Sequence, residues 1–505
     1  MPKYLLAHDL GTSGNKATLY SLDGKLVASK TVSYPTNFFN GNWAEQNPQD
    51  WWKAICDSTQ ALLAAVSAAD IAVVSLSGQM MGCTVVDQAG NALRPSILYC
   101  DQRSTRQAEH ILSRIDMKGF YDIVGHRVSA SYSLEKLMWI RDNEPEIYRK
   151  THKTLCAKDY INLKLTGQIA TDYSDASGTN AFDLNTFTWS AKVIDIAGVD
   201  ASMFPPPRES VDILGTVTSQ AARETGLKEG TPVAVGGGDG SCAGVGVGCI
   251  KPGTAYNYLG SSSWIALTVK KPIVDEQMRT MNWAHCVPGY LHPSGTMQTA
   301  GSSHNWLKNT LCFEENQAAS AAGGDPYDLI EKAMAAAPPG SNGVLFLPYM
   351  LGERTPWWNP NARGAFIGLN LATKREDMLR AVLEGVTMNL GIIVNIFRNH
   401  VPMDAITAIG GGAKSPLWRQ MMADIYDCRV QSLNFLEEAT SMGAAVIGGV
   451  AAGLFKDFEV IGRFIKVEHT AEPNAENQKK YRKMMPILEK AYRGLVDVYE
   501  DLARA

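Results

Sequence analysis

The chain lacks the residue pairs that usually hold a transition metal or form a redox centre. Its nine cysteines are scattered and none falls in a Cys-x-x-Cys pair, which argues against a structural zinc site or a redox dithiol. Its nine histidines show no His-x-His or His-x-x-x-His pair. We therefore expect any metal to be Mg²⁺ held by oxygen ligands, and the cysteines to be buried, reduced thiols.

Strong charge of one sign and long apolar runs are also missing. The formal net charge is −4, so the chain lacks the basic stripe of a nucleic-acid-binding protein. No apolar run approaches the roughly 20 residues that span a bilayer, and Asp9 interrupts the apolar start where a signal peptide would need its core. We expect a cytoplasmic protein without a nucleic-acid or membrane partner.

The chain is long enough for more than one domain. Its 505 residues exceed one ordinary hydrophobic core, and its content of 45% hydrophobic and 19% charged residues is that of globular proteins. Strand-like and helical runs alternate along the first half, which predicts an α/β fold. We place the boundary between two domains at residues 245 and 246.

Glycine-rich turns follow strand-like runs in distant parts of the chain. The first carries Asp9, and the second carries Asp239 after three consecutive glycines. Small residues let backbone N–H groups approach a polyanion, and hydroxyl groups add donors. The small residues concerned are Gly11, Thr12 and Ser13 in the first turn, and Gly260, Ser261 and Ser262 in a third turn after the run 255–259. Two such turns, with two carboxylates to hold a metal and take a proton, suit phosphoryl transfer.

The order of elements around these turns repeats. After the first turn the pattern predicts a strand over 17–22, a turn at Asp23 and Gly24, and a strand over 26–34. Residues 255–269 begin in the same way, with a strand, a small-residue turn and a second strand. We interpret the chain as two distant copies of one unit that face each other over a cleft. Taken singly, each turn is equally typical of a plain tight turn.

Further stretches bear on the fold and the site. Apolar residues at helical spacing predict a helix over 51–67, with Asp50 as its N-cap. A strand over 71–76 leads into the loop 77–82, and in α/β sheets ligands bind beyond such ends. The run 377–397 predicts a core helix, and the charged tail 475–505 predicts a helix that lies solvated on the surface.

Longer segments resemble the FGGY family of carbohydrate kinases, most closely its xylulokinase branch. Residues 131–143 (SYSLEKLMWIRDN) are similar to one family signature, and residues 364–369 (GAFIGL) followed by 377–384 (DMLRAVLE) are similar to the other. Residues 347–356 (LPYMLGERTP) and 410–415 (GGGAKS) are similar to further family segments. The resemblance covers nearly the whole chain.

The resemblance implies an actin-like ATPase fold of the α/β class, with two RNase H-like domains around a central cleft. An N-terminal FGGY domain over 1–245 would bind sugar and phosphate, and a C-terminal FGGY domain over 246–505 would bind the nucleotide. ATP and Mg²⁺ are the implied cofactors, and a small sugar is the implied partner. A homodimer would be in keeping with the family.

The resemblance also assigns chemical roles to the two aspartates. Asp239 is expected to be the general base that takes the proton of the sugar hydroxyl as its oxygen attacks the γ-phosphate. Asp9 and Asp239 are expected to hold Mg²⁺ near the β- and γ-phosphates. The alternatives are that Asp239 caps a helix beginning near Ser241, and that Asp9 satisfies N–H groups of its turn.

The nucleotide site implied by the resemblance draws on both halves. Lys16 would add positive charge near the phosphates, although a surface position is nearly as common for lysine. Gly411 and Gly412 resemble the adenosine-binding turn of the family, for which a plain strand-to-helix turn is the alternative. The cofactor-binding set is Gly11, Thr12, Ser13, Lys16, Gly260, Ser261, Ser262, Gly411 and Gly412.

The sugar site implied by the resemblance departs from the xylulokinase pattern at two positions. Its members are Gln79, Met80, Met81, Asp101 and Asp239. Xylulokinases usually have histidine at 81 and asparagine at 240, where this chain has Met81 and Gly240. Both changes remove polar groups, and sites that recognise hydroxyls discriminate through such groups, so the identity of the sugar stays open.

Other residues can complete the site. Candidates to help hold the sugar are Trp43, Tyr99, Arg103, Trp283 and His304, and Glu353 and Arg354 are expected to form an ion pair near the cleft. A hinge is predicted over 244–254, which is rich in glycine. Closure there would displace water and protect ATP from hydrolysis.

The leading hypothesis is an ATP-dependent kinase for a ketopentose such as D-xylulose, giving xylulose 5-phosphate. Another sugar, polyol or sugar acid, such as ribulose, gluconate or glycerol, stays open as the acceptor. An actin- or Hsp70-like ATPase would need a peptide-binding or polymerising region, which we do not find in the sequence. A sugar sensor that has lost catalysis is disfavoured by Asp9 and Asp239.

Overall fold

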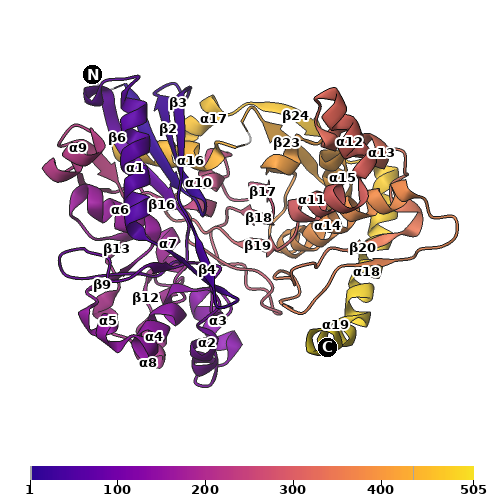
Figure 1. The fold of residues 1–505 in the computed structure, drawn as a ribbon, viewed down its shortest axis with the longest axis horizontal. Helices are drawn as coiled ribbons and strands as arrows, with labels where there is room; N and C mark the ends of the chain where they lie inside the picture. The colour runs from indigo at the N-terminus through magenta and orange to yellow at the C-terminus, as the bar shows by residue number, and fades with distance from the viewer. Residues whose placement is uncertain (1–2, 436) are drawn as a thin grey trace.

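Two β-sheets of the same topology form the centres of two lobes (Figure 1). The computed structural model describes residues 3–435 and 437–505. The first sheet contains β1 (Tyr4–Leu10), β2 (Gly14–Ser21), β3 (Leu26–Ser33), β6 (Ile71–Gly78), β14 (Ile213–Thr216), β15 (Pro232–Ala234) and β16 (Gly237–Gly238). The second contains β17 (Ala255–Leu259), β18 (Ser263–Leu267), β19 (Ser294–Met297), β22 (Ala405–Ile409), β23 (Arg429–Leu433) and β24 (Val467–Ala471).

The strand directions confirm the predicted repeat. In the order β3-β2-β1-β6-β15-β14, successive pairs are antiparallel, antiparallel, parallel, parallel and antiparallel. The order β19-β18-β17-β22-β23-β24 has the same sequence of directions. The tight turn predicted at Asp23 and Gly24 joins β2 to β3, and Gly24 adopts a φ of +82° that favours glycine.

Helices from both halves of the chain cover the first sheet. One face packs against α1 (Pro48–Leu63), and the other packs against α10 (Asp239–Gly246) and α16 (Ala439–Ala451). Figure 1 shows α16 in a late-chain colour among the early strands. Leu5 and Val73 of the sheet share one buried cluster with Met442. The core of the first lobe therefore includes residues beyond 245, and the division at 245 and 246 stays a prediction.

The N-terminal end of α1 differs from the prediction. Asn47 is the N-cap, and its side chain accepts the N–H of Gln49, while Asp50 lies in the first turn. Pro48 explains the difference, because proline suits the first helical position, where no N–H partner is needed. The helix ends at Leu63 rather than near residue 67.

Small elements flank the first sheet: some pack against its core, and others form a packed cluster of their own. They include β4 (Asn37–Phe39), β5 (Trp43–Gln46), β7 (Thr84–Val86), β8 (Ser96–Ile97), α2 (Thr105–Leu112), α3 (Met117–Val124), α4 (Ser133–Asn143), α5 (Pro145–Lys150), β9 (Lys153–Leu155), α6 (Ala157–Thr166), β10 (Thr171–Asp172), α7 (Tyr173–Ser177), β11 (Phe182–Asp183), β12 (Thr188–Trp189), α8 (Ala191–Ala197), β13 (Pro207–Arg208) and α9 (Ser219–Thr225). The signature segment 131–143 forms α4, whose apolar residues lie in this cluster.

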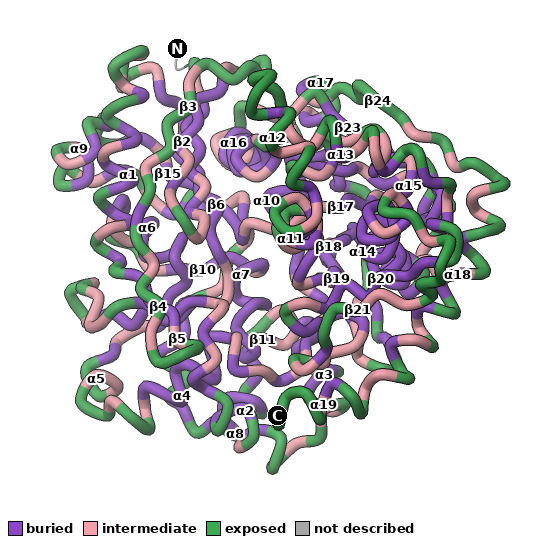
Figure 2. Tube along the Cα trace, turned by 45° about the vertical axis from the view of Figure 1, so that its right-hand side comes forward, coloured by how far each residue is buried: buried purple, intermediate pink, exposed green. Residues whose placement is uncertain are grey.

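The second lobe is organised around α14 (Arg375–Arg398), as the apolar run predicted. Among the described residues this is the one helix long and apolar enough to cross a membrane, but 94% of its apolar window is buried inside the protein. Figure 2 shows it buried under its neighbours. The neighbours of α14 include α11 (Gly301–Leu311), α13 (Pro326–Ala335), β20 (Leu345–Leu347) and α15 (Pro416–Tyr426). The same half of the chain also forms α12 (Phe313–Ala322), β21 (Ala365–Ile367) and α17 (Ile461–Phe464), and α17 packs in the core of the first lobe.

The C-terminal tail is not one solvated helix, as the sequence suggested. It forms α18 (Ala475–Gly494) and α19 (Val496–Arg504), which bury one face in the core of the second lobe. The buried side chains of α18 are Tyr481, Met485, Leu488 and Tyr492. Their spacing of four, three and four residues is an apolar stripe, which the many charged residues on the other face obscured.

Candidate active site

The turns around Asp239 meet at one edge of the first sheet. Strands β1, β6 and β16 end in register, with Leu10 opposite Gly78 and Gly78 opposite Gly238. Parallel neighbours present their following residues at a common edge, where ligands bind in α/β proteins. The first turn, the loop from Gln79 and the residue Asp239 are therefore brought together there.

Glycine is required where β16 approaches this edge. A Cβ at Gly237 would lie 2.2 Å from the Cys286 Sγ atom, and a Cβ at Gly238 would lie 2.6 Å from the Met80 Sδ atom. Only glycine avoids both contacts without a shift of the neighbours. The consecutive glycines thus place Asp239 at the first position of α10, directly after the glycine that approaches Met80.

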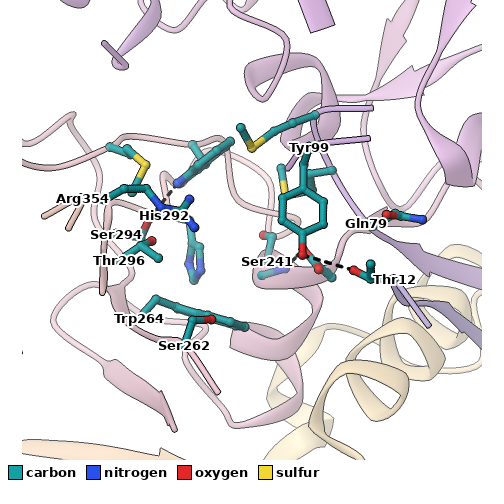
Figure 3. Close-up of a pocket in the computed structure, with 16 residues that line it drawn as sticks. Thr12, Gln79, Tyr99, Ser241, Ser262, Trp264, His292, Ser294, Thr296 and Arg354 are labelled. Atoms are coloured by element: carbon teal, nitrogen blue, oxygen red, sulfur yellow. Dashed lines mark hydrogen bonds between the residues drawn. The ribbon is translucent and has the colours of Figure 1, made fainter. Parts of the chain in front are cut away.

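A cavity of about 200 Å³ lies in front of Asp239, and side chains from both halves of the chain point into it (Figure 3). The first half contributes Thr12, Gln79, Met80, Met81, Tyr99, Asp239, Gly240 and Ser241. The second half contributes Ser262, Trp264, Met281, Trp283, His292, Ser294, Thr296 and Arg354. Relative motion of the two lobes would therefore change the shape of this cavity.

The electrostatics of the cavity favour a proton acceptor near neutral pH. Burial, and then the negative charge of Asp9, raise the pKa of Asp239 to about 7. Burial raises the pKa of Asp9 to about 6. The Ser77 hydroxyl donates to Asp9 Oδ1 over 3.2 Å, and this hydrogen bond lowers the pKa by a smaller amount. A general base works best when its pKa lies near the operating pH. The two carboxylates interact, and Asp239 has the pKa that such a base needs.

The raised pKa predicts how turnover depends on pH. If Asp239 is the general base that the sequence predicts, only its deprotonated carboxylate can accept the proton, and with a pKa of about 7 most of it is protonated at lower pH. We expect kcat/KM to rise as the pH passes through about 7 and then to level off. A pH series at saturating Mg-ATP measures this, and a profile that stays flat from acidic to neutral pH would contradict it.

The two positions that depart from the xylulokinase pattern, Met81 and Gly240, offer no polar side-chain group to the cavity. Met81 has a φ of +65°, and its carbonyl oxygen accepts a hydrogen bond from Lys136 Nζ over 2.8 Å. Lys136 belongs to α4, and burial lowers its pKa to about 8. No atom lies within 4 Å of a Cβ built on Gly240. The signature helix α4 therefore supports the turn that presents the Met81 thioether to the cavity.

The second-lobe wall of the cavity was predicted only in part: Ser262, Trp283 and Arg354 were named from the sequence, whereas Trp264, His292, Ser294 and Thr296 were not. Trp264 pairs with Thr296 across β18 and β19, and Ser294 lies two residues from Thr296, so their side chains share one face. Trp283 Nε1 donates to Ser294 Oγ over 2.8 Å. Burial lowers the pKa of His292 well below its ordinary value, so its imidazole is neutral. The alternation of Ser294 and Thr296 was the one local signal of this wall.

Arg354 is the one lysine or arginine among the residues that line the cavity. The expected ion pair with Glu353 is not found among the described residues. The guanidinium instead donates to Gln298 Oε1 over 2.7 and 2.9 Å, while Glu353 Oε1 accepts the backbone N–H groups of Gln298 and Arg354. Burial raises the pKa of Glu353 to about 8, which removes the charge that an ion pair would need.

The predicted nucleotide turns of the second lobe lie side by side. Tyr258 of β17 pairs with Ile409 of β22, so the turns after both strands emerge at one edge. A Cβ at Gly412 would lie 3.0 Å from Leu259 and Trp418 atoms, whereas one at Gly411 would meet nothing within 4 Å. Gly411 therefore presents open backbone, in keeping with its predicted role beside adenosine, which stays a prediction together with the roles assigned to Gly11, Ser13, Gly260 and Ser261.

Two predicted ligands have other partners in this structure. Lys16 Nζ lies 2.9 Å from Glu438 Oε1, so its charge is already paired. The Asp101 carboxylate is fully buried, accepts the Ala44 N–H over 2.6 Å, pairs with Arg103 over 2.7 Å, and does not line the cavity. Of the additional sugar-site candidates, Tyr99 and Trp283 line the cavity, whereas Trp43, Arg103 and His304 do not.

Comparisons with known proteins cover the whole chain. Models of the FGGY family of carbohydrate kinases match it, the N-terminal domain over residues 4–246 and the C-terminal domain over 255–452. A xylulose kinase of Bacillus subtilis strain 168 is 33% identical over 494 residues, which is 97% of each chain. A gluconokinase of the same strain is 31% identical over 509 residues, covering 100% of this chain and 98% of the relative.

A solved structure agrees with the sequence relatives. The ligand-bound xylulose kinase from Lactobacillus acidophilus matches with a TM-score of 0.92 at 26% identity, over 99% of this chain and 100% of that chain. The actin-like α/β fold inferred from the sequence is thereby confirmed. On the strength of the two domain matches and the full-length relatives, the chain belongs to the FGGY family of carbohydrate kinases.

Proposed function

We propose that this carbohydrate kinase transfers the γ-phosphate of ATP to a hydroxyl of an open-chain ketopentose such as D-xylulose. Family membership supplies the class of reaction, with ATP as donor and a small sugar as acceptor. The observation that carries the proposal is the partly buried Asp239 carboxylate, with a pKa of about 7, at a cavity lined by both halves. The xylulose kinase relatives support a ketopentose as the acceptor.

Asp239 acts as the general base in this proposal. The sugar hydroxyl gives its proton to the Asp239 carboxylate while its oxygen forms the bond to the γ-phosphorus, and the bond from that phosphorus to the ADP oxygen breaks. A positioned base contributes typically about 10²- to 10⁴-fold to the rate. Most of the remaining acceleration comes from holding the two substrates together in the closed cavity.

Asp9 and Asp239 are suited to Mg²⁺. Their carboxylates interact, as the effect of Asp9 on the pKa of Asp239 shows, and both offer only oxygen. Magnesium keeps several waters and needs one or two protein carboxylates, so this pair is sufficient. When bound, Mg²⁺ neutralises charge on the phosphates. The small-residue turns that hold Thr12 and Ser262 add hydroxyl donors at the same cavity.

A sugar acid such as gluconate is the second candidate acceptor. Arg354 places a guanidinium in the cavity wall, and guanidinium groups bind carboxylates well. A gluconokinase relative covers the chain as fully as the xylulose kinases do. The thioether at Met81 and the missing side chain at Gly240 remove two groups that would otherwise recognise sugar hydroxyls.

A coupled ADP-release assay with Mg-ATP tests the proposal. The panel contains D-xylulose, ribulose, gluconate, glycerol and aldoses. Turnover strongest with xylulose supports the ketopentose, and turnover strongest with gluconate selects the sugar acid. ADP release that no member of the panel stimulates would overturn both assignments.

A substitution of Arg354 distinguishes the two acceptors. If a carboxylate binds there, Arg354→Gln lowers kcat/KM for gluconate by about 10- to 100-fold, because a hydrogen bond to a charged group contributes about 1.5–3 kcal/mol. The value for xylulose would change much less. Arg363→Gln, at an exposed arginine that bonds only backbone carbonyls, is the matched control. Equal losses for both sugars would exclude a carboxylate site at Arg354.

A further inference from the structure

We propose that Ser174 is a positioning residue for Asp239, held in place by a buried cluster of charged side chains behind the cavity. The proposal rests on the role of Asp239 in the proposed function. Ser174 lies in the short helix α7, far from Asp239 in the sequence, and it does not line the cavity.

The contact that carries the proposal is one hydrogen bond to the start of α10. The backbone N–H of Gly238 donates to Ser174 Oγ over 2.8 Å. Gly238 is the N-cap of α10 and immediately precedes Asp239. Because glycine has no side chain, this residue cannot cap its own helix, and the preceding residues are also glycines. Ser174 therefore adds a side-chain restraint to a segment that is otherwise held by the backbone pairing of β16 with β6.

The hydroxyl of Ser174 has its hydrogen-bonding capacity fully used. It donates to Asp172 Oδ2 over 2.5 Å, and it accepts from Gly238 and from the Cys286 thiol, whose sulfur lies 3.8 Å away. A serine hydroxyl has one donor and two lone pairs. Because the Ser174 hydroxyl proton is donated to Asp172 Oδ2, its two lone pairs are left for Gly238 and Cys286.

Asp172 is itself oriented by charge. Lys158 Nζ lies 3.2 Å from Asp172 Oδ1, 2.6 Å from an oxygen of Asp159 and 3.3 Å from one of Asp175. All four side chains are buried. Burial opposes the charge of Lys158, but the three carboxylates outweigh it and raise its pKa well above the ordinary value. A lysine that stays charged keeps Asp172 turned towards it, with Oδ2 left for serine hydroxyls.

The chain of contacts thus runs from Lys158 through Asp172 and Ser174 to the N–H that precedes the base. A displacement of about 1 Å of a reacting group can cost about 10²-fold in rate. Removing the Ser174 hydroxyl frees Gly238 and admits water to the start of α10.

Ser210 provides a matched control within the same cluster. Ser210 Oγ donates to the same Asp172 Oδ2 atom over 2.9 Å, and its side chain is buried as deeply, but it does not bond Gly238 through its side chain. Ser174→Ala and Ser210→Ala each remove one buried hydroxyl from Asp172. A purely structural role would therefore affect both variants alike.

Three measurements on the full chain test the proposal. Ser174→Ala is expected to lower kcat by about 10- to 100-fold with nucleotide affinity retained. Ser210→Ala is expected to keep kcat within about threefold of the wild-type value. Amide hydrogen exchange at Gly238 should quicken at least about tenfold in Ser174→Ala and stay unchanged in Ser210→Ala.

The exchange measurement does not depend on finding the substrate. If the wild-type chain phosphorylates no sugar, the proposed function fails, while faster exchange at Gly238 in Ser174→Ala alone would still establish the restraint. Equal exchange at Gly238 in both variants, or equal losses of kcat in both variants, would overturn the positioning role.

Discussion

Asp239→Asn is expected to lower kcat by about 10²- to 10⁴-fold, the contribution of a positioned general base. Asparagine has nearly the same shape and its amide oxygen can still accept the N–H of Gly240, which Asp239 Oδ1 accepts over 2.7 Å. It has no basic atom to take the sugar proton. The coupled ADP-release assay measures the loss, and calorimetry with ATP should show that the variant still binds nucleotide.

The result separates catalysis from helix capping. In the structure Gly238 is the N-cap of α10, and Asp239 is its first residue. Asp325 is a suitable control, since its side chain caps α13 by accepting the N–H of Tyr327 over 2.9 Å. Asp325→Asn should leave kcat unchanged. Near-normal turnover in Asp239→Asn would show that Asp239 is not the base.

The local parts of the site could be predicted from the sequence. Asp9 lies near the end of β1, Asp239 directly follows β16, and the hairpin at Gly24 has the expected residues. These features could be predicted because strand alternation and turn chemistry act over a few neighbouring residues. The repeat of strand, small-residue turn and strand indicated two related units. The register of β1, β6 and β16 then explains why turns so distant in the sequence meet at one edge.

Long-range packing could not be predicted in the same way. The sequence of α16 (Ala439–Ala451) predicts a buried helix, because it is apolar on every side. It does not indicate that this helix packs against the first sheet rather than in the core of the second lobe. The sequence also did not indicate that Asp101, whose role in the sugar site stays a prediction, forms a buried ion pair with Arg103. Trp264 and Thr296 meet in the second-lobe wall because β18 pairs with β19, and no sequence motif predicts this pairing.

The glycines at the crossing of α10 and α16 are the positions where an added methyl group is expected to lower stability most. A Cβ at Gly443 would lie 1.8 Å from the carbonyl oxygen of Cys242, and a Cβ at Gly246 would lie 1.8 Å from that of Ala439. Both obstacles are backbone atoms, which cannot turn aside as a flexible side chain can. The two helices therefore pack backbone to backbone, and α10 carries Asp239 at its first position.

Gly443→Ala is therefore expected to lower the free energy of unfolding by about 1–3 kcal/mol, the usual cost of overpacking a core. It should also lower kcat, because separating the helices moves Asp239 relative to the cavity. Gly462→Ala in α17 is the control: no atom lies within 4 Å of its Cβ, so its stability should change little. Thermal and urea denaturation compare the two variants. A Gly443→Ala protein as stable as the Gly462→Ala protein would mean that the crossing can widen without strain, and that the position of Asp239 does not depend on it.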